Sequence, residues 1–545
     1  MDTLPDTYDF VVVGSGAAAL TAALTASAGG LAVAIVEKSD KIGGTSAMSG
    51  AGTWIPGNHH ARAAGIQDTA AATLTYLQNA LPDGWEDEDR HRWQTFISQA
   101  PLMLEFVERR TPLRYELIDE PDPMAELPGG MSAGRMLSPR PLSRRITGRY
   151  AGAIRRSTLP HIFTYGEMQD VDPYHTPLLA GLRMWPKLLW RWATDSRAQG
   201  SALIAGLLKG CLDQGCTLEL RARALRLVQD GPGGRVAGVE IEQSGASRVL
   251  AARRAVLLAT GGFEWNEEMR EAHFPGPFDR IGSPRTNEGD GQRMAAEVGA
   301  QLDRMDQANV HPTIPTRYEG RLHGLPVVFQ SEPHAIMVDR TANRFVSEYD
   351  YNIGEAIDRR DAEGKLVRLP VWVIADRRFL RRSSPFRAYA RLDPNWIRRA
   401  PTLRGLAEAV DLPADALEAT VARFNRFCAE GRDADFQRGE SVWQRYKADI
   451  QEGGPNLTLG TIDRPPFVAI PLNRSILGTK GGARTDERAR ALRPDGSVIE
   501  GLFCAGLAMA NPFGTRSIGA GTTIGPNMTW GYVAANTVLG NEAGG

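Results

Sequence analysis

The sequence predicts an α/β fold in which a parallel sheet binds a dinucleotide, and two observations near the start of the chain predict it. Residues 8–20 read YDFVVVGSGAAAL, an apolar strand followed by a glycine turn and a helix of small residues. A second apolar stretch ends on Glu37, 21 residues after Gly16. This order of elements is typical of a Rossmann-like βαβ unit: a strand, a G-x-G-x-x-G/A turn, a helix, a second strand and an acid.

Each part of this unit has a physical reason to bind the cofactor. Residues 11–13 are valines, apolar on both faces as a buried parallel strand requires. Gly14 permits the tight turn, and Gly16 lets the backbone approach a pyrophosphate at the N-terminus of the next helix. Glu37 is placed to accept hydrogen bonds from a ribose, and Ser15 to contact a phosphate. The residues predicted to bind the dinucleotide here are Gly14, Ser15, Gly16, Ala17, Ala18, Glu37 and Lys38.

A second loop of small residues favours FAD as the dinucleotide. Residues 41–52 read KIGGTSAMSGAG, and a flat ring that lies on backbone requires such residues. Apolar stretches at residues 255–263 and 501–508 end in glycine and predict strands that return to the same sheet. No second G-x-G-x-x-G with a downstream acid is present, so we expect an external electron acceptor (a quinone, a dye or oxygen) and no separate nicotinamide domain. The further residues predicted to bind FAD are Gly43, Gly44, Thr45, Ser46, Gly50, Gly52, Thr260, Gly261, Gly506, Thr523 and Ile524.

The positions of these motifs predict a discontinuous domain organisation. We expect residues 1–302 and 469–545 to form an FAD-binding, Rossmann-like domain of the glutathione-reductase type. Residues 303–468 lie between two sheet-completing glycine motifs and are expected to form an inserted α+β catalytic domain. Its sheet is expected to include SEPHAIMVD at residues 331–339 and NRFVSE at residues 343–348.

Composition narrows the function classes. The chain has 545 residues, 42% of them hydrophobic, which supports two sizeable cores. Its formal net charge of −1 gives no basic surface for nucleic acid. The four cysteines have no C-x-x-C spacing, and no signal peptide or membrane-spanning segment is expected. These features predict a cytoplasmic protein with reduced thiols.

Two further stretches are open to more than one interpretation. The aromatic and basic stretch LRMWPKLLWRW, at residues 182–192, is interpreted as a partly buried amphipathic helix, with contact to a membrane or to an apolar substrate entrance as the alternative. His59 and His60 could suggest a metal site, but no acid or cysteine accompanies them at ligand spacing. We therefore expect them to be loop residues and expect no metal.

Five segments resemble the 3-ketosteroid Δ1-dehydrogenases, which belong to the wider fumarate-reductase-like group of flavoproteins. The segments are GGTSAMSGAGTWIPGN (43–58), FQRGESVWQRY (436–446), LGTKGGARTD (477–486), RPDGSVIEGLFCAG (493–506) and GAGTTIGPNMTWGYVAA (519–535). The resemblance spans both ends of the chain and part of the middle. It implies FAD, an inserted catalytic domain, and an active site between that domain and the flavin.

The resemblance also implies the chemistry. A base removes the proton α to a ketone, a hydride leaves the β carbon for flavin N5, and hydrogen-bond donors stabilise the carbonyl oxygen. In the family a catalytic tyrosine follows a segment similar to residues 343–348, which favours Tyr351 as the base, with Tyr349 as its rival. The position of Gly521 matches a backbone N–H that donates to the ketone. Alternatively, both tyrosines are ordinary packing residues of the inserted domain.

The sequence departs from the family at two substrate-contacting tyrosines. The tyrosine that donates to the ketone is replaced by Ser517, which is too short to span the same gap. A second tyrosine is missing where Pro123 and Met124 stand. Arg516 could donate to the ketone or pair with a substrate carboxylate; alternatively, it pairs with a nearby acid or with helix-end carbonyls.

Together these observations predict an FAD-dependent dehydrogenase that introduces a C=C bond next to a ring ketone. The substrate would be a 3-ketosteroid or a smaller cyclic ketone or keto acid, such as 4-oxocyclohexanecarboxylate. A flavin-dependent enoate reductase is the first alternative, because such enzymes use an arginine to deliver a proton and Arg516 is present. A flavin carrier without catalytic activity is the second.

Overall fold

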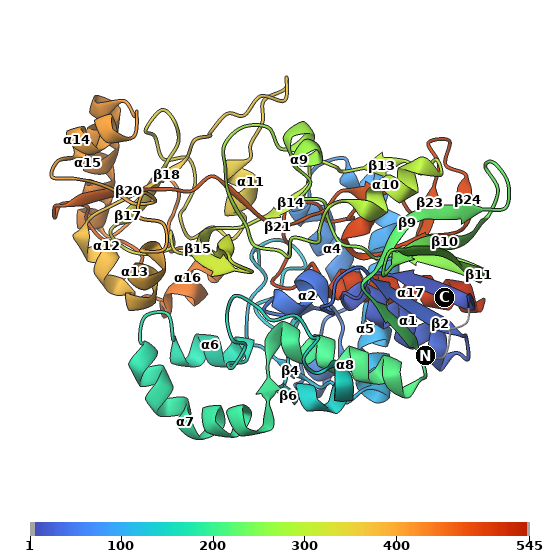
Figure 1. The fold of residues 1–545 in the computed structure, drawn as a ribbon. Helices are drawn as coiled ribbons and strands as arrows, with labels where there is room; N and C mark the ends of the chain where they lie inside the picture. Colours follow the sequence, from blue (N-terminus) through green and yellow to red (C-terminus); the bar gives the residue numbers. More distant parts are fainter. Residues whose placement is uncertain (1–5, 542–545) are drawn as a thin grey trace.

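The computed structural model describes residues 6–541, and its largest sheet is the dinucleotide-binding sheet (Figure 1). Five of its strands run parallel, so their carboxyl ends meet at one edge. That edge is where open α/β sheets bind their ligands. The strand order is β23 (Arg490–Leu492), β24 (Val498–Cys504), β11 (Ala246–Leu258), β1 (Thr7–Val13), β2 (Val33–Glu37) and β8 (Thr217–Leu220), with β23 antiparallel to β24.

Helices α1 (Ala17–Ala28) and α17 (Ile524–Leu539) pack against each other beside this sheet. A Cβ at Gly531 would overlap the backbone of Ala18, so the glycine allows the close approach of the two helices. The first and last segments of the chain are thereby held together at the nucleotide end of the sheet. Helix α8 (Gln199–Asp213) also contacts α1, and α5 (Trp85–Arg110) also contacts α17.

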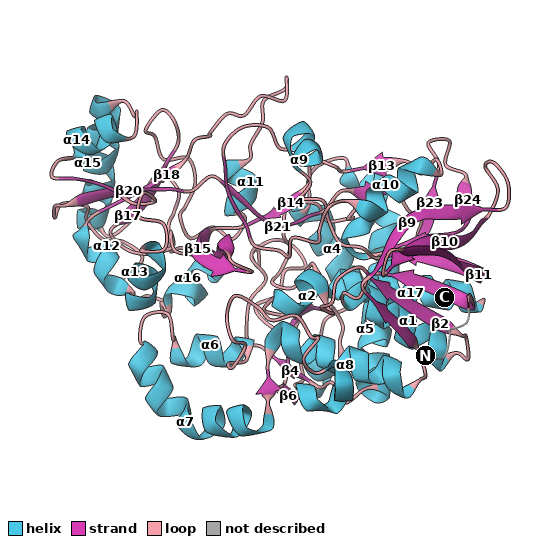
Figure 2. Cartoon of the chain, viewed as in Figure 1, coloured by secondary structure: helices cyan, strands magenta, loops and turns pink. Residues whose placement is uncertain are grey.

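The second large unit is a four-stranded antiparallel sheet (Figures 1 and 2). Apolar side chains pack on both of its faces. Its order is β17 (Ala335–Val338), β18 (Trp372–Ala375), β20 (Phe467–Pro471) and β19 (Arg398–Ala400). Alternation along the strands places Val373 in a core with α12 (Arg377–Arg382) and α13 (Ser384–Ala390), and Ile374 in a core with α14 (Leu403–Ala409) and α15 (Ala414–Glu430). Residue 469, which we expected to begin the second part of the FAD-binding domain, lies inside β20.

One expected strand is absent from this sheet. Residues 343–348 have no regular secondary structure and end in a turn, which corrects the prediction that they form a strand. The reason is electrostatic: Arg344 pairs with Glu348, four residues later, at 2.9 Å and with Asp433 at 2.8 Å. The side chains of all three residues are buried, and this local pairing folds the segment back on itself.

Two further strands, β9 (Ala222–Gln229) and β10 (Val236–Gln243), belong to the largest sheet, because β10 pairs with β11 and with β9. The other elements complete the fold. The helices are α2 (Gly44–Met48), α3 (His59–Ala63), α4 (Ala70–Ala80), α6 (Tyr165–Val171), α7 (Pro177–Thr194), α9 (Glu267–His273), α10 (Asp290–Glu297), α11 (Ile353–Ile357) and α16 (Val442–Ala448), with 3₁₀ turns at Arg144–Tyr150 and Gly506–Ala508. The strands are β3 (Thr53–Trp54), β4 (Tyr115–Leu117), β5 (Met136–Pro139), β6 (Leu142–Ser143), β7 (Ser196–Arg197), β12 (Phe278–Ile281), β13 (Leu302–Asp303), β14 (Ala308–Val310), β15 (Thr313–Tyr318), β16 (Arg321–Pro326), β21 (Arg474–Thr479) and β22 (Gly482–Ala483). Among the described residues, none of the helices combines the length and the apolar character needed to cross a bilayer.

Candidate active site

A long pocket lies at the carboxyl ends of β1, β11 and β24, where the predicted cofactor residues converge. It extends from Glu37 and Ala222 to the start of α17 at Ile524. The predicted residues that line it are Gly14, Ser15, Gly16, Ala17, Ala18, Glu37, Lys38, Gly44, Thr45, Ser46, Thr260, Gly261, Gly506, Thr523 and Ile524. Gly43, Gly50 and Gly52, which were also predicted, are not part of this lining.

Two features of the pocket fit a dinucleotide. Gly14 has φ +114°, and a Cβ there would overlap the carbonyl of Ala259, the residue that follows β11, so the turn between strand and helix requires glycine. The hydroxyl of Thr260 is buried and has no partner within the protein, although it belongs to the pocket lining. A buried polar atom of this kind calls for a partner from a ligand.

Ser15 and Glu37 interact with each other in the described structure. The Ser15 hydroxyl donates to Glu37 Oε2 at 2.5 Å and accepts from the Gly43 N–H at 3.0 Å. Burial raises the pKa of the Glu37 carboxyl, and its hydrogen bond with Ser15 opposes that shift. Ser15 therefore ties the glycine turn to the acid and to the second loop, a role that we did not predict from its position in the motif.

Tyr351 lies where the inserted segment meets the C-terminal glycine turn. Together with Tyr165 it packs against Ile118, Met136 and Ala520, the residue before Gly521. Its ring also forms an edge-to-face contact with Trp443, with centroids 4.6 Å apart. The structure therefore brings Tyr351 to the glycine turn from 169 positions away in the sequence, as the difference from Ala520 shows.

Burial raises the pKa of the Tyr351 phenol, the negative charge of Glu120 raises it further, and the Ser517 hydroxyl acts in the opposite direction. The phenol is consequently protonated at neutral pH. It can lose its proton only when the field around it changes or the pH rises.

The glycine turn itself is packed against the second small-residue loop. Gly521 has φ +95°, and a Cβ there would overlap the carbonyl of Gly52 and lie 2.5 Å from the N atom of Thr53. Its own carbonyl accepts a hydrogen bond from the Trp54 N–H at 3.4 Å. Both the backbone conformation and the contact with Gly52 therefore require glycine at residue 521.

Ser517 is held within the turn by its neighbours. Its hydroxyl lies 2.7 Å from the Thr522 hydroxyl and donates to the Gly519 carbonyl at 3.0 Å. Asn352, the residue after Tyr351, accepts from the Ser517 N–H at 2.8 Å and donates to the Ser517 carbonyl at 3.2 Å. Sequence reasoning missed Asn352; its adjacency to the favoured base was the one available signal.

A polar cluster that the sequence did not reveal lies beside Tyr351. The Tyr165 hydroxyl donates to Glu120 at 3.1 Å, and the Gln169 amide donates to the same carboxyl at 2.7 Å. The Tyr446 hydroxyl in turn donates to Gln169 at 2.5 Å. Burial raises the pKa of the Glu120 carboxyl, while its hydrogen bonds and the charge of Lys447 oppose the shift. Tyr165 also reaches the second loop, because a Cβ at Gly50 would lie 3.6 Å from its ring.

Tyr349, the rival candidate, lies elsewhere. Its side chain is buried beneath the Arg438 guanidinium, which sits 4.9 Å from the ring centroid. Burial raises the pKa of Tyr349 to about 12, although Arg438 opposes that shift. This environment is that of a packing residue stabilised by a cation–π contact.

Arg516 is bound to an acid of the protein. Its guanidinium forms a two-pronged ion pair with Glu355, with distances of 2.7 and 2.6 Å, and donates to the Ala80 carbonyl at 3.1 Å. Hydrogen bonding to Glu355 raises the pKa of Arg516. Of the roles considered for Arg516, the structure therefore shows the one in which it pairs with a nearby acid of the protein.

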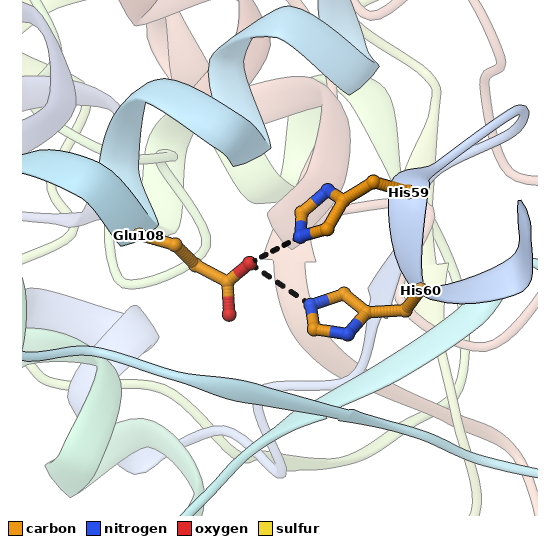
Figure 3. A group of neighbouring side chains, drawn as sticks. All are labelled: His59, His60 and Glu108. Atoms are coloured by element: carbon orange, nitrogen blue, oxygen red, sulfur yellow. Dashed lines mark hydrogen bonds and ion pairs between the residues drawn. The ribbon is translucent and has the colours of Figure 1, made fainter. Parts of the chain in front are cut away.

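His59 and His60 do have an acidic partner, contrary to the expectation from sequence spacing (Figure 3). Both lie on helix α3, not in a loop, and their Nε2 atoms are 2.8 and 2.9 Å from Glu108 Oε2. Burial acts to raise the pKa of Glu108, but hydrogen bonds with His60 and with the Tyr115 N–H, together with the proximity of both histidines, lower it. Glu108 comes from α5, so proximity in the sequence could not reveal it.

Comparison with known proteins agrees with this geometry. Residues 9–524 match the family described as FAD binding domain. The chain is 36% identical over 553 residues to the protein named 4-oxocyclohexanecarboxylate 2-dehydrogenase of Sinomonas cyclohexanicum, covering 99% of this chain and 94% of that protein. It is 35% identical over 561 residues to 3-oxosteroid 1-dehydrogenase of Mycobacterium tuberculosis, with 97% of each covered. A crystal structure of 3-ketosteroid delta1-dehydrogenase from Sterolibacterium denitrificans, in complex with 1,4-androstadiene-3,17-dione, aligns with a TM-score of 0.87 at 32% identity, covering 99% of this chain and 100% of that one.

Proposed function

We propose that this protein forms a C=C bond next to a ring ketone. The chain belongs to the family of FAD-binding flavoproteins. The family match confirms the predicted α/β fold, the FAD cofactor and the resemblance to ketosteroid dehydrogenases. The protein is therefore an FAD-dependent oxidoreductase of the class that acts on CH–CH donors.

The observation that carries the proposal is that Tyr351 packs against the cluster that contains Ala520, the residue before Gly521. The same turn continues into Thr523 and Ile524, which line the cofactor pocket. Bound FAD would accept the hydride released from the β carbon. The tyrosinate form of Tyr351 is proposed to take the α proton and become the neutral phenol, while the Gly521 N–H donates to the ketone oxygen. The donor matters because the α proton becomes acidic enough for a side chain only when the developing enolate is hydrogen-bonded.

The substrate is proposed to be a cyclic ketone, and the observations favour an uncharged one. Ile118, Met136 and Trp443 surround Tyr351 with apolar surface suited to a ring system. Arg516, which could have paired with a substrate carboxylate, is neutralised by Glu355. A 3-ketosteroid therefore fits better than 4-oxocyclohexanecarboxylate, although relatives named for both ketones are similarly close to this chain.

The same ion pair argues against an enoate reductase. A proton-delivering arginine must release its proton toward the substrate, but Arg516 points to Glu355 and its pKa is raised. This leaves no observation that favours the reductase as a second function.

We extend the proposal to organisation, electron acceptor and compartment. The flavin-binding part would comprise residues 1–302 and the C-terminal segment, and the inserted part residues 303–468, with the return near β20. Electrons would leave to an external quinone, dye or oxygen. Cys211, Cys216, Cys428 and Cys504 are free, which suits a cytoplasmic protein.

The test is anaerobic mixing of the purified yellow protein with a 3-ketosteroid or with 4-oxocyclohexanecarboxylate, while flavin absorbance is followed. Bleaching by the steroid alone supports the proposal in full. Bleaching by the keto acid alone keeps the reaction and corrects the substrate. If neither ketone bleaches the flavin, and an enoate reoxidises the dithionite-reduced protein, the proposed function is wrong.

A further inference from the structure

Helix α7 lies at the lower edge of the molecule in the view of Figure 1. It carries an apolar surface that is exposed. Thirteen large hydrophobic side chains are exposed in the part of the chain that the structure describes, and seven of them belong to this one helix. The seven are Leu178, Leu179, Leu182, Trp185, Leu189, Trp190 and Trp192. A concentration of this kind marks an interaction site, since single exposed hydrophobic residues are usually scattered.

The exposed residues form a continuous stripe. Leu178, Leu182, Trp185, Leu189 and Trp192 are spaced alternately four and three residues apart, which places them on one helix face. Their exposed fractions are 84%, 71%, 61%, 56% and 75%. The sequence predicted a partly buried amphipathic helix, and the buried residues of α7 agree with that interpretation. The exposed stripe on its other face is what the alternative, contact with a membrane or with an apolar substrate entrance, requires.

The opposite side of α7 is anchored to the protein. Ala180, Met184 and Arg191 are buried there. Arg191 pairs with Glu167 of α6 at 2.6 Å and donates to the Ile162 carbonyl at 2.5 Å. Because this pairing fixes the rotation of the helix, the apolar stripe is held outward by the fold itself.

The chemistry around the stripe fits the surface of an anionic phospholipid bilayer. Arg183 and Lys187 are exposed beside it, and α7 contains no acidic residue. Tryptophans are well suited to the boundary between headgroups and acyl chains, and basic residues are attracted to anionic headgroups. We propose that α7 docks this protein on an anionic membrane as an interfacial helix that lies in the plane of the surface.

Docking through α7 would place the membrane near the candidate site. Residues 172–176 connect α7 to α6, whose first residue, Tyr165, packs beside Tyr351. An apolar ketone or a quinone dissolved in the bilayer would then be concentrated close to the site. The docking proposal itself does not depend on the identity of the substrate.

Flotation of the FAD-loaded protein with vesicles tests the proposal without turnover. Phosphatidylcholine vesicles are compared with vesicles of phosphatidylcholine and phosphatidylglycerol. We expect the wild type to float with the anionic vesicles, and Leu182→Glu/Leu189→Glu to bind at least about tenfold more weakly. Arg183→Gln/Lys187→Gln should lose the preference for the anionic lipid. Leu457→Glu, which changes an exposed leucine outside α7, is the matched control and should bind like the wild type.

Flavin content and the thermal midpoint establish that each variant is folded. Quenching of tryptophan emission by brominated lipids provides a second measurement on the unmodified chain. The proposal is overturned if the wild type stays with the unbound fraction, or if the double glutamate variant floats equally well. It is also overturned if light scattering without lipid shows a dimer that the glutamate variant abolishes, since a second copy would then cover the stripe.

Discussion

Asn352 holds the backbone of Ser517 at both of its polar groups, accepting from the N–H at 2.8 Å and donating to the carbonyl at 3.2 Å. Because Asn352 follows Tyr351 directly, the same two bonds fix the distance between the proposed base and the glycine turn. The two halves of the candidate site, which are 165 residues apart, are therefore joined by one amide side chain.

Replacing Asn352 by alanine removes both bonds. We expect kcat to fall by about tenfold to a hundredfold, because small misplacements of reacting groups have effects of this size. Flavin content should stay at the wild-type level, since Asn352 does not line the cofactor pocket. Steady-state kinetics with a dye acceptor, together with the flavin absorbance of the purified variant, checks both expectations. An unchanged kcat would show that the turn keeps its position without Asn352.

Tyr351→Phe and Tyr349→Phe form a matched pair for the assignment of the base. Removing the Tyr351 hydroxyl should lower kcat by at least about a hundredfold, as is usual for a general base. The Tyr349 variant should keep most of its activity, because that side chain lies beneath Arg438 and not beside the glycine turn. Rapid anaerobic mixing gives the rate of flavin reduction for each. The opposite ranking of the two variants would move the base to Tyr349.

Gly521→Ala tests the packing of the turn against the second loop. The positive φ alone is expected to cost about 1–3 kcal/mol, and the new Cβ would also collide with the backbone of Gly52 and Thr53. We expect a lower thermal midpoint and partial loss of FAD during purification. Gly540→Ala is a suitable control, because Gly540 has a similar positive φ of 82° with no atom near the position of its Cβ. Equal flavin retention in the two variants would contradict the packing argument.

The ion pair between Arg516 and Glu355 lends itself to a double-mutant cycle. Both side chains are about one-third exposed, so the pair should contribute no more than about 1 kcal/mol to the free energy of unfolding. Arg516→Gln and Glu355→Gln should therefore cause similar small losses in urea unfolding, and the double variant should be no worse than either single one. A large loss of kcat in Arg516→Gln, with Glu355→Gln fully active, would instead indicate direct contact between Arg516 and the substrate.

How far the sequence could predict this molecule depended on the separation of the interacting residues. Gly14, Gly16 and Glu37 form one local βαβ unit, and local spacing was sufficient to place them in a dinucleotide pocket. The ion pair between Arg516 and Glu355 joins residues 161 positions apart, and only the fold brings them together. Residues 343–348 were predicted to form a strand, but the buried ion pairs of Arg344 with Glu348 and Asp433 favour an irregular backbone there.

The same limit applies to the acids near the histidines and the tyrosines. Glu108 reaches His60 across 48 residues, and Glu120 reaches Tyr165 across 45. Neither separation in the sequence corresponds to a recognised motif, so the spacing of the residues could not predict either hydrogen bond. What the sequence did supply was the identity of groups that need partners, since buried ionisable side chains are normally paired.

Glu120→Gln should move the pH dependence of the reaction in a defined direction. The charge of Glu120 raises the pKa of the Tyr351 phenol, so removing that charge makes the tyrosinate easier to form. If Tyr351 is the base, log kcat/KM of the wild type rises with pH across the alkaline range, because the phenol must lose its proton first. The rise in Glu120→Gln should begin at lower pH. Glu116→Gln is the control, since Glu116 is not among the groups that act on the pKa of Tyr351. A shift to higher pH, or the same alkaline rise in Tyr351→Phe, would exclude this electrostatic link between the carboxyl and the base.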